Sequence, residues 1–193
     1  MPDSRISLPK NRKLRADAER NRVLLLEAAK PVLAAKGGRA SLEEIARSAA
    51  VGIGTLYRHF PNRDHLIIAV YEAEIDRLVE AADALADHPD PIEALRQWIF
   101  VFIDFIATKF GMSEAIGSLV GGHSELYSVS TERIRAAIGK LVAAAEQAGQ
   151  LKMAIEPLDL LRAVAGLRDG SEDAEWQEGA RRITDVLIAG MRI

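Results

Sequence analysis

The side chains best suited to chemistry in this sequence lie in the stretch from Ser41 to Phe60, SLEEIARSAAVGIGTLYRHF. Around the apolar Leu56 stand small, hydroxyl and cationic residues: Ile53, Gly54, Thr55, Tyr57, Arg58 and His59. Small and polar groups can approach base edges in a DNA groove, and hydroxyl or cationic groups can bind phosphate oxygens. The segment therefore predicts non-covalent recognition of DNA.

Patterns typical of enzymes and metal sites do not occur. The chain has no cysteine, which excludes a disulfide scaffold, a thiolate zinc site and a cysteine nucleophile. Gly52-Ile53-Gly54 follows a helical segment and lacks the third glycine of a dinucleotide fingerprint, and no phosphate-binding loop, HExxH pair or nucleophile elbow is present. The four histidines are scattered along the chain. We expect no catalytic residues, no cofactor and no metal site.

Charge divides the 193 residues into two parts. Residues 1–62 carry 12 Lys and Arg against 6 Asp and Glu, whereas residues 63–193 carry 13 against 22. A basic N-terminal part on an acidic remainder suggests that one end of the protein meets a polyanion. No apolar run is long enough to span a membrane, and residues 1–22 lack the apolar core of a signal peptide, so we expect a cytoplasmic protein with no membrane partner.

Hydrophobic periodicity predicts an all-α protein of about nine helices. Residues 1–15 have no apolar stripe and are expected to form a basic mobile arm. The first helix is expected from Asp17 to Lys36, with a kink at Pro31 and a stop at Gly37-Gly38. Long helices are then expected from Asn62 to Ala86 and, after the Asp90 cap and Pro91, from Ile92 to Phe110. The remaining helices are expected at 113–120, 126–148, 157–167 and 174–192.

Two short helices around a tight turn are predicted between the first two long ones. Ser41 as N-cap and Glu44 three positions later form a capping box, followed by the buried face Leu42, Ile45, Ala46 and Ala49. Ala50-Val51-Gly52 is the turn, and the next helix places Leu56 and Phe60 inward. This is the helix-turn-helix pattern.

Together with the upstream RVLLLEAAKPVLAAKG and the downstream PNRDHLIIAVY, this segment resembles the N-terminal DNA-binding domain of TetR-type transcriptional regulators over about residues 19–79. The resemblance implies that Thr55 lies near base edges and that Tyr57 and His59 touch phosphates. It also implies a phosphate contact for Arg63 at the start of the long helix, with Ser41 next to the DNA backbone. Ala50 departs from the family's glycine, and a left-handed alanine there costs about 1 kcal/mol.

The segment Leu141 to Leu167, LVAAAEQAGQLKMAIEPLDLLRAVAGL, resembles the C-terminal domain of the SbtR-like branch of the same family. This resemblance implies a helix-turn-helix domain over residues 16–62, extending to about 79, and a regulatory and dimerisation domain over residues 63–193. The last two helices would pair with a second copy through Leu160, Leu161, Val164, Leu167, Ile183, Val186, Leu187 and Ile188. The alternative is that these residues complete a core within one chain.

Aromatic residues concentrate in the helix from Ile92 to Phe110, which is apolar nearly all round. Ligand pockets are mostly apolar, so this helix is the candidate lining of an effector site, although such a stripe is more often core than pocket. The candidate pocket residues are Trp98, Phe102, Phe105, Ile106, Met112, His123 and Tyr127, with Asp104, Glu114 and Glu125 as nearby ionisable groups. The expected effector is an apolar or weakly polar small molecule.

The sequence therefore predicts a DNA-binding transcriptional regulator, a ligand-responsive repressor that acts as a homodimer on a palindromic double-stranded operator. Two alternatives stay open. One is an orphan regulator whose C-terminal domain only dimerises, and the other is a sequence-independent architectural DNA-binding protein.

Overall fold

The computed structural model describes residues 10–119, 124–168 and 175–193, and these residues form nine α-helices, one short 3-10 helix and no strand. The elements are α1 (Lys10–Lys36), η1 (Gly37–Arg39), α2 (Leu42–Ser48), α3 (Ile53–His59), α4 (Arg63–Leu85), α5 (Pro91–Gly111), α6 (Ser113–Gly117), α7 (Ser124–Gln147), α8 (Pro157–Gly166) and α9 (Glu175–Met191). The predicted all-α fold is confirmed. None of the described helices combines the length and apolar character needed to cross a membrane.

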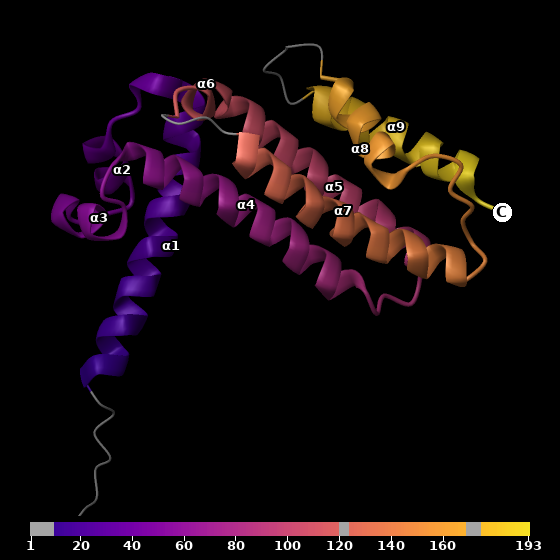
Figure 1. Cartoon of the computed structure of the whole chain (residues 1–193), viewed down its shortest axis with the longest axis horizontal. Helices are drawn as coiled ribbons and strands as arrows, with labels where there is room; N and C mark the ends of the chain where they lie inside the picture. Colours follow the sequence, from indigo (N-terminus) through magenta and orange to yellow (C-terminus); the bar gives the residue numbers. More distant parts are fainter. Residues whose placement is uncertain (1–9, 120–123, 169–174) are drawn as a thin grey trace, which may run out of the picture.

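Two parts are visible in Figure 1: a head made of α2, α3 and α1, and a body in which α5 and α7 run beside α4. α8 and α9 cover the side of the body away from α4 and pack against α5 and α7. α4 is the element that belongs to both parts, because it packs against α1 in the head and against α5 and α7 in the body.

The first helix is longer than predicted. It begins at Lys10, so residues 10–15 of the expected mobile arm are helical, and residues 1–9 lie outside the described residues. Leu14 is exposed, and this end of α1 projects beyond the head (Figure 1). Lys, Arg, Leu and Ala favour a helix intrinsically, which explains why this segment is helical without an apolar stripe. α1 continues through Pro31 and ends at Lys36, before Gly37, whose φ of +48° suits glycine.

Local signals position α2 and α3 as predicted. The Ser41 hydroxyl accepts a hydrogen bond from the Glu44 backbone amide at 3.4 Å. The Glu44 carboxylate does not return to Ser41 to complete the capping box, because it pairs with Lys36 at 2.7 Å. Ala50 adopts a φ of +53° in the turn, so the expected left-handed alanine is present. Leu56 and Phe60 are buried and hold α3 against the head.

Helices α4 and α5 begin at the predicted caps. The Asn62 side chain accepts from the His65 amide at 3.0 Å at the start of α4. The Asp90 carboxylate accepts from the amides of Ile92 and Glu93 at the start of α5. The indole Nε1 of Trp98 on α5 donates to the Leu78 carbonyl of α4 at 2.8 Å, which fixes the two helices against each other deep in the core.

The body helix α5 is buried on most sides, as expected from its sequence. Its buried residues are Ile92, Ala94, Leu95, Trp98, Ile99, Phe102, Ile103, Phe105 and Ile106. Phe100 is half-buried, and Phe110 is 40% exposed, with the Arg168 guanidinium 4.4 Å from its ring centroid. The aromatic segment therefore supplies both core and surface.

One nearly buried ion pair joins the head to the connecting helix. The Lys30 ammonium of α1 lies 2.6 Å from a carboxylate oxygen of Glu74 on α4, whose side chain is only 3% exposed. Lys30 also contacts Glu27 at 2.7 Å, and Arg77 approaches the second Glu74 oxygen at 3.6 Å. Burial alone would lower the pKa of Lys30, but the hydrogen bonds and attraction from Glu27 and Glu74 outweigh it and raise that pKa.

This arrangement predicts unequal effects of removing the two partners. Lys30→Met leaves the Glu74 carboxylate buried with only the longer, more exposed contact to Arg77, and we expect it to lower the free energy of unfolding by about 3 kcal/mol. Glu74→Gln leaves Lys30 paired with Glu27, and we expect a loss of about 1 kcal/mol. Urea unfolding measures both. The double variant Lys30→Met/Glu74→Leu is the control and should regain most of the loss, whereas equal losses in the two single variants would contradict this account.

Candidate DNA-reading face and effector pocket

The outward side of α3 carries the residues that the sequence singled out. Ile53 and Tyr57 are 39% and 45% exposed, Gly54 and Arg58 are exposed, and Leu56 is fully buried on the opposite side. Because Leu56 anchors the helix, its outer side stays free of packing. A side-chain Cβ added at Gly54 would meet no atom within 4 Å. Helix α3 therefore presents an open face to solvent.

Two other candidates on this face are half-buried. Thr55 and His59 both lie at intermediate exposure, and the His59 ring is tilted against the buried Phe60 with ring centroids 6.1 Å apart. Their polar groups sit closer to the body of the head than those of Tyr57 and Arg58. The open face of α3 is therefore formed mainly by Ile53, Gly54, Tyr57 and Arg58.

Ser41 and Arg63 are engaged within the head. The Ser41 hydroxyl caps α2 and donates to the Glu43 carboxylate at 2.7 Å, a hydrogen bond that lowers the pKa of Glu43. Arg63 begins α4, as predicted, but its guanidinium is half-buried and donates to the carbonyl of Gly37, the residue that follows α1 and begins η1. The same carbonyl also accepts a hydrogen bond from the Ala40 amide at 3.3 Å. The sequence had predicted only a phosphate contact for Arg63.

Positive charge on the head is available for other partners. Arg39, Arg47 and Arg58 are all exposed, and within the described part of the chain none of them forms an ion pair with a carboxylate. Lys36, in contrast, is neutralised by Glu44. Unpaired arginines on the part of the molecule that presents α3 are suited to phosphate binding.

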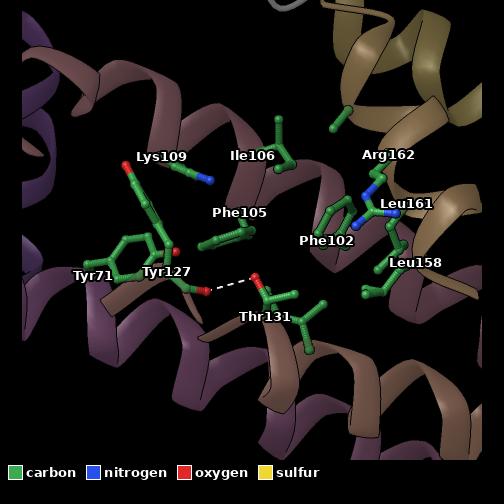
Figure 2. A pocket seen from close by; sticks show the side chains of 12 residues that line it. Tyr71, Phe102, Phe105, Ile106, Lys109, Tyr127, Thr131, Leu158, Leu161 and Arg162 are labelled. Atoms are coloured by element: carbon green, nitrogen blue, oxygen red, sulfur yellow. Dashed lines mark hydrogen bonds between the residues drawn. The ribbon is translucent and has the colours of Figure 1, made fainter. Parts of the chain in front are cut away.

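A cavity of about 240 Å³ lies in the body between α4, α5, α7 and α8 (Figure 2). Its lining residues are Tyr71, Phe102, Phe105, Ile106, Lys109, Tyr127, Thr131, Ile134, Leu158, Leu161, Arg162 and Ala165. We call this cavity the body pocket. Four of the predicted residues line it, namely Phe102, Phe105, Ile106 and Tyr127.

Two predicted pocket residues are core instead. Trp98 and Met112 are fully buried and do not line the cavity. Trp98 stacks on Phe102 with ring centroids 6.1 Å apart and gives its indole hydrogen to Leu78, so it supports the pocket wall from behind. His123 lies outside the described residues. Sequence spacing along one helix could not separate the side facing the cavity from the side facing the core.

The other lining residues come from helices far apart in the sequence, and the sequence analysis missed them. Tyr71 belongs to α4, Thr131 and Ile134 to α7, and Leu158, Leu161, Arg162 and Ala165 to α8. Lys109, in the last turn of α5, also lines the pocket. The ionisable group expected beside it, Asp104, is instead hydrogen-bonded to Gln177 and Arg181 of α9.

Most polar groups of the body pocket already have partners. The Thr131 hydroxyl donates to the Tyr127 carbonyl at 2.7 Å (Figure 2), and the Tyr71 hydroxyl is hydrogen-bonded to Ser130. Burial raises the pKa of Tyr71 and of Tyr127, so both phenols are neutral near pH 7. Burial lowers the pKa of Lys109, whose ammonium lies 4.7 Å from the centroid of the Tyr127 ring.

A second hollow of about 600 Å³ lies where α1, α5 and α6 meet. Glu114, another group expected near the pocket, lines this hollow rather than the body pocket. Arg168 and Trp176 also border it, and they flank residues 169–174, which lie outside the described residues. The hollow is bordered by more charged and fewer aromatic side chains than the body pocket.

The predicted dimerisation residues divide into two groups. Leu160, Leu161, Val164 and Ile188 are buried within this chain, so for these four the prediction was wrong and the alternative of an intrachain core holds. Leu187 is half-buried against the same core. Leu167, Ile183 and Val186 are 40%, 42% and 67% exposed. Helices α8 and α9 use one apolar side to pack on the body, and the apolar pattern alone could not tell burial within one chain from burial between two.

The described residues contain no group of three or more His, Asp or Glu side chains that could hold a metal ion. The described residues thus present an open helix face, a basic head, an aromatic pocket and an exposed aliphatic strip of α8 and α9, formed by Leu167 just after α8 and by Ile183 and Val186 of α9.

Comparison with known families agrees with both parts of the molecule. Residues 25–70 match the family described as bacterial regulatory proteins, tetR family. Residues 90–193 match the C-terminal domain of the SbtR-like transcriptional regulators. The two resemblances predicted from the sequence are confirmed.

Solved structures with similar folds include two with substantial sequence identity. The TetR transcriptional regulator SCO0520 from Streptomyces coelicolor is 38% identical, with a TM-score of 0.79 over 89% of this chain and 98% of that chain. The TetR transcription regulatory protein from Mycobacterium vanbaalenii is 32% identical, with a TM-score of 0.75 over 93% and 99% of the two chains. Both similarities extend across head and body.

Two named regulators are similar over a shorter stretch. The HTH-type transcriptional regulator SAR0097 from Staphylococcus aureus is 36% identical over 81 residues, which are 40% of this chain and 42% of that protein. The HTH-type transcriptional repressor KstR from Mycolicibacterium smegmatis is 33% identical over 75 residues, 38% of this chain and 37% of that protein. The chain thus aligns with about two fifths of the length of each. With its fold, its helix-turn-helix head and these similarities taken together, the chain belongs to the TetR family of DNA-binding transcriptional regulators and carries an SbtR-like C-terminal domain.

Proposed function

We propose that this chain is a ligand-responsive repressor that binds a palindromic operator as a homodimer. The observation that carries the proposal is the presence of three surfaces on one helical scaffold: the open face of α3, the body pocket and the exposed aliphatic strip of α8 and α9. Each surface has a separate task, and α4 connects them.

At the DNA end, α3 enters the major groove with its outer side. Gly54 permits close approach because nothing stands where a side chain would be, and Thr55 lies near base edges. Tyr57, His59 and Arg58 bind the flanking phosphates, with Ser41 beside the DNA backbone. Arg63 contributes its charge while it also holds the Gly37 carbonyl. Among the similar proteins, KstR is named a repressor, which supports repression as the outcome of binding.

At the other end, two copies pair through the outer sides of α8 and α9. Val186 and Ile183 are large aliphatic side chains exposed in a single chain, and covering them is favourable. A single helix-turn-helix makes few base contacts, and two-fold dimers read half-sites about 34 Å apart. Pairing through α8 and α9 leaves both heads free for DNA.

The body pocket and the head are coupled through α4. Tyr71 of α4 lines the pocket, and Glu74, one helical turn further, makes the ion pair to Lys30 of α1. A ligand that displaces Tyr71 therefore tilts the helix that carries the head. Coupling of this kind is typically worth about 1–3 kcal/mol.

The test of the proposal is binding of the purified protein to its own upstream intergenic DNA, titrated against competitor DNA at two salt concentrations. The proposal predicts tight binding that survives competitor, because base contacts do not depend on salt as phosphate contacts do. Binding that competitor abolishes and modest salt erases would favour a sequence-independent DNA-binding protein instead.

Gly54→Ala separates DNA contact from folding. Nothing lies within 4 Å of the added methyl group, so we expect the stability of the protein to be kept and operator affinity to fall about tenfold. Gly139→Ala in α7 is the matched control, since its surroundings are equally empty and it lies in the body. Fluorescence anisotropy with labelled operator measures both. Equal operator affinities of the two variants would contradict the assignment of the α3 face.

Val186→Arg tests the proposed dimer surface. A cation placed in an apolar interface loses its hydration, so we expect the variant to sediment as a monomer at concentrations where the parent is a dimer. Val129→Arg on α7 replaces a valine that is also more than half exposed, and it serves as the control that should stay dimeric. Analytical ultracentrifugation distinguishes the two states. A dimeric Val186→Arg protein would place the interface elsewhere.

A further inference from the structure

We propose that the ligand of the body pocket is an organic anion, a carboxylate on an aromatic or compact apolar body, and that the Lys109 ammonium receives the carboxylate. The inference rests on the proposed function of the body pocket as effector site, and it names the chemical class of the effector. It departs from the sequence-based expectation of an apolar or weakly polar molecule.

Lys109 is placed to receive an anion. It lies in the last turn of α5, and its side chain points into the body pocket above the Tyr127 ring (Figure 2). The ammonium lies 4.7 Å from that ring centroid, a cation–π contact worth about 0.5–2 kcal/mol. Among the side chains that the structure describes, which leave out Glu125, no Asp or Glu forms an ion pair with it.

The remaining polar groups of the body pocket do not supply the missing negative charge. Its lining contains no Asp or Glu among the side chains that the structure describes, which do not include that of Glu125. Thr131 donates to a backbone carbonyl, and Arg162, the second cation of the lining, pairs with Asp159 at 2.7 Å on the outer side of α8. A partly buried cation without an anion is costly, and the lowered pKa of Lys109 reflects this cost.

A neutral ligand that covers Lys109 would remove more water from its ammonium and so raise the free-energy cost of burying this charge. A cationic ligand would add repulsion. An anion would remove the cost by forming a charge-assisted hydrogen bond shielded from water. The electrostatics of the pocket therefore select anions over neutral molecules of the same shape.

Shape and lining define the rest of the ligand. Phe102, Phe105 and Ile106 form an apolar wall beside Lys109, and Leu158 and Leu161 close the far side (Figure 2). A cavity of about 150 Å³ holds benzene, so a volume of about 240 Å³ suits roughly ten non-hydrogen atoms. Arylcarboxylates between benzoate and naphthoate have this size and this combination of an apolar body with one charge.

The experiment compares acids with their neutral amides, which have nearly the same shape. Isothermal titration of the full chain with 2-naphthoate and 2-naphthamide, and with benzoate and benzamide, measures the preference for charge. We expect at least one acid to bind the parent protein about tenfold more tightly than its amide. Lys109→Met should abolish this preference, whereas Lys109→Arg, which keeps the charge, should retain part of it.

Arg162→Met is the matched control, because it removes the other cation of the lining, whose side chain is 70% exposed. We expect the preference for the acid to survive in this variant. Equal affinity of acid and amide for the parent, an unchanged preference in Lys109→Met, or no binding of either acid below about 1 mM would each overturn the inference. Operator binding is measured on the same samples. A protein that binds its operator but shows none of the expected preference for the acid would contradict the inference about the ligand and leave the proposed function as a DNA-binding regulator standing.

Discussion

The structure depends on α4 being packed into two units at once. Near its start, Arg63 donates to the carbonyl of Gly37, the residue just after α1, and further along Glu74 holds Lys30 of α1 in a nearly buried ion pair. In its second half, the Leu78 carbonyl accepts the Trp98 indole hydrogen from α5. Because charged and polar bonds anchor both halves, the head cannot rotate freely about the body. The orientation of α3 is therefore defined relative to α8 and α9.

This constraint gives the body pocket its proposed influence on DNA binding. Tyr71 contributes one wall of the pocket from α4, between the two head anchors Arg63 and Glu74 and about two turns before the Trp98 contact at Leu78. A ligand that fills the pocket presses on the same helix that carries the head. The proposed organic anion would also neutralise the charge of Lys109. The free energy gained from this ion pair would then favour both ligand binding and the accompanying shift of α4.

Sequence reasoning succeeded where the signal was local. The caps Ser41, Asn62 and Asp90 and the left-handed Ala50 were all predicted, because capping and turn chemistry depend on residues within a few positions of one another. The open outer side of α3 followed from the buried Leu56 at its centre.

Predictions that depended on tertiary neighbours did less well. Leu160, Leu161 and Val164 form an apolar side of α8, but their period does not reveal that the partner is their own body. Lys109 stood in the sequence as an ordinary basic residue near a helix end, and only the approach of α7 and α8 places it in a pocket. Trp98 and Met112 were assigned to the pocket, but both are buried in the core. Aromatic and apolar residues form pocket walls as well as cores, so their type alone does not separate the two.

The most direct test of the central claim, that α4 holds two α3 helices of a dimer at a spacing suited to DNA, is a hydroxyl-radical footprint on the upstream intergenic DNA. The account predicts two protected segments related by two-fold symmetry, with centres about one helical turn or a multiple of it apart. A single protected segment, or protection without symmetry or fixed spacing, would contradict it.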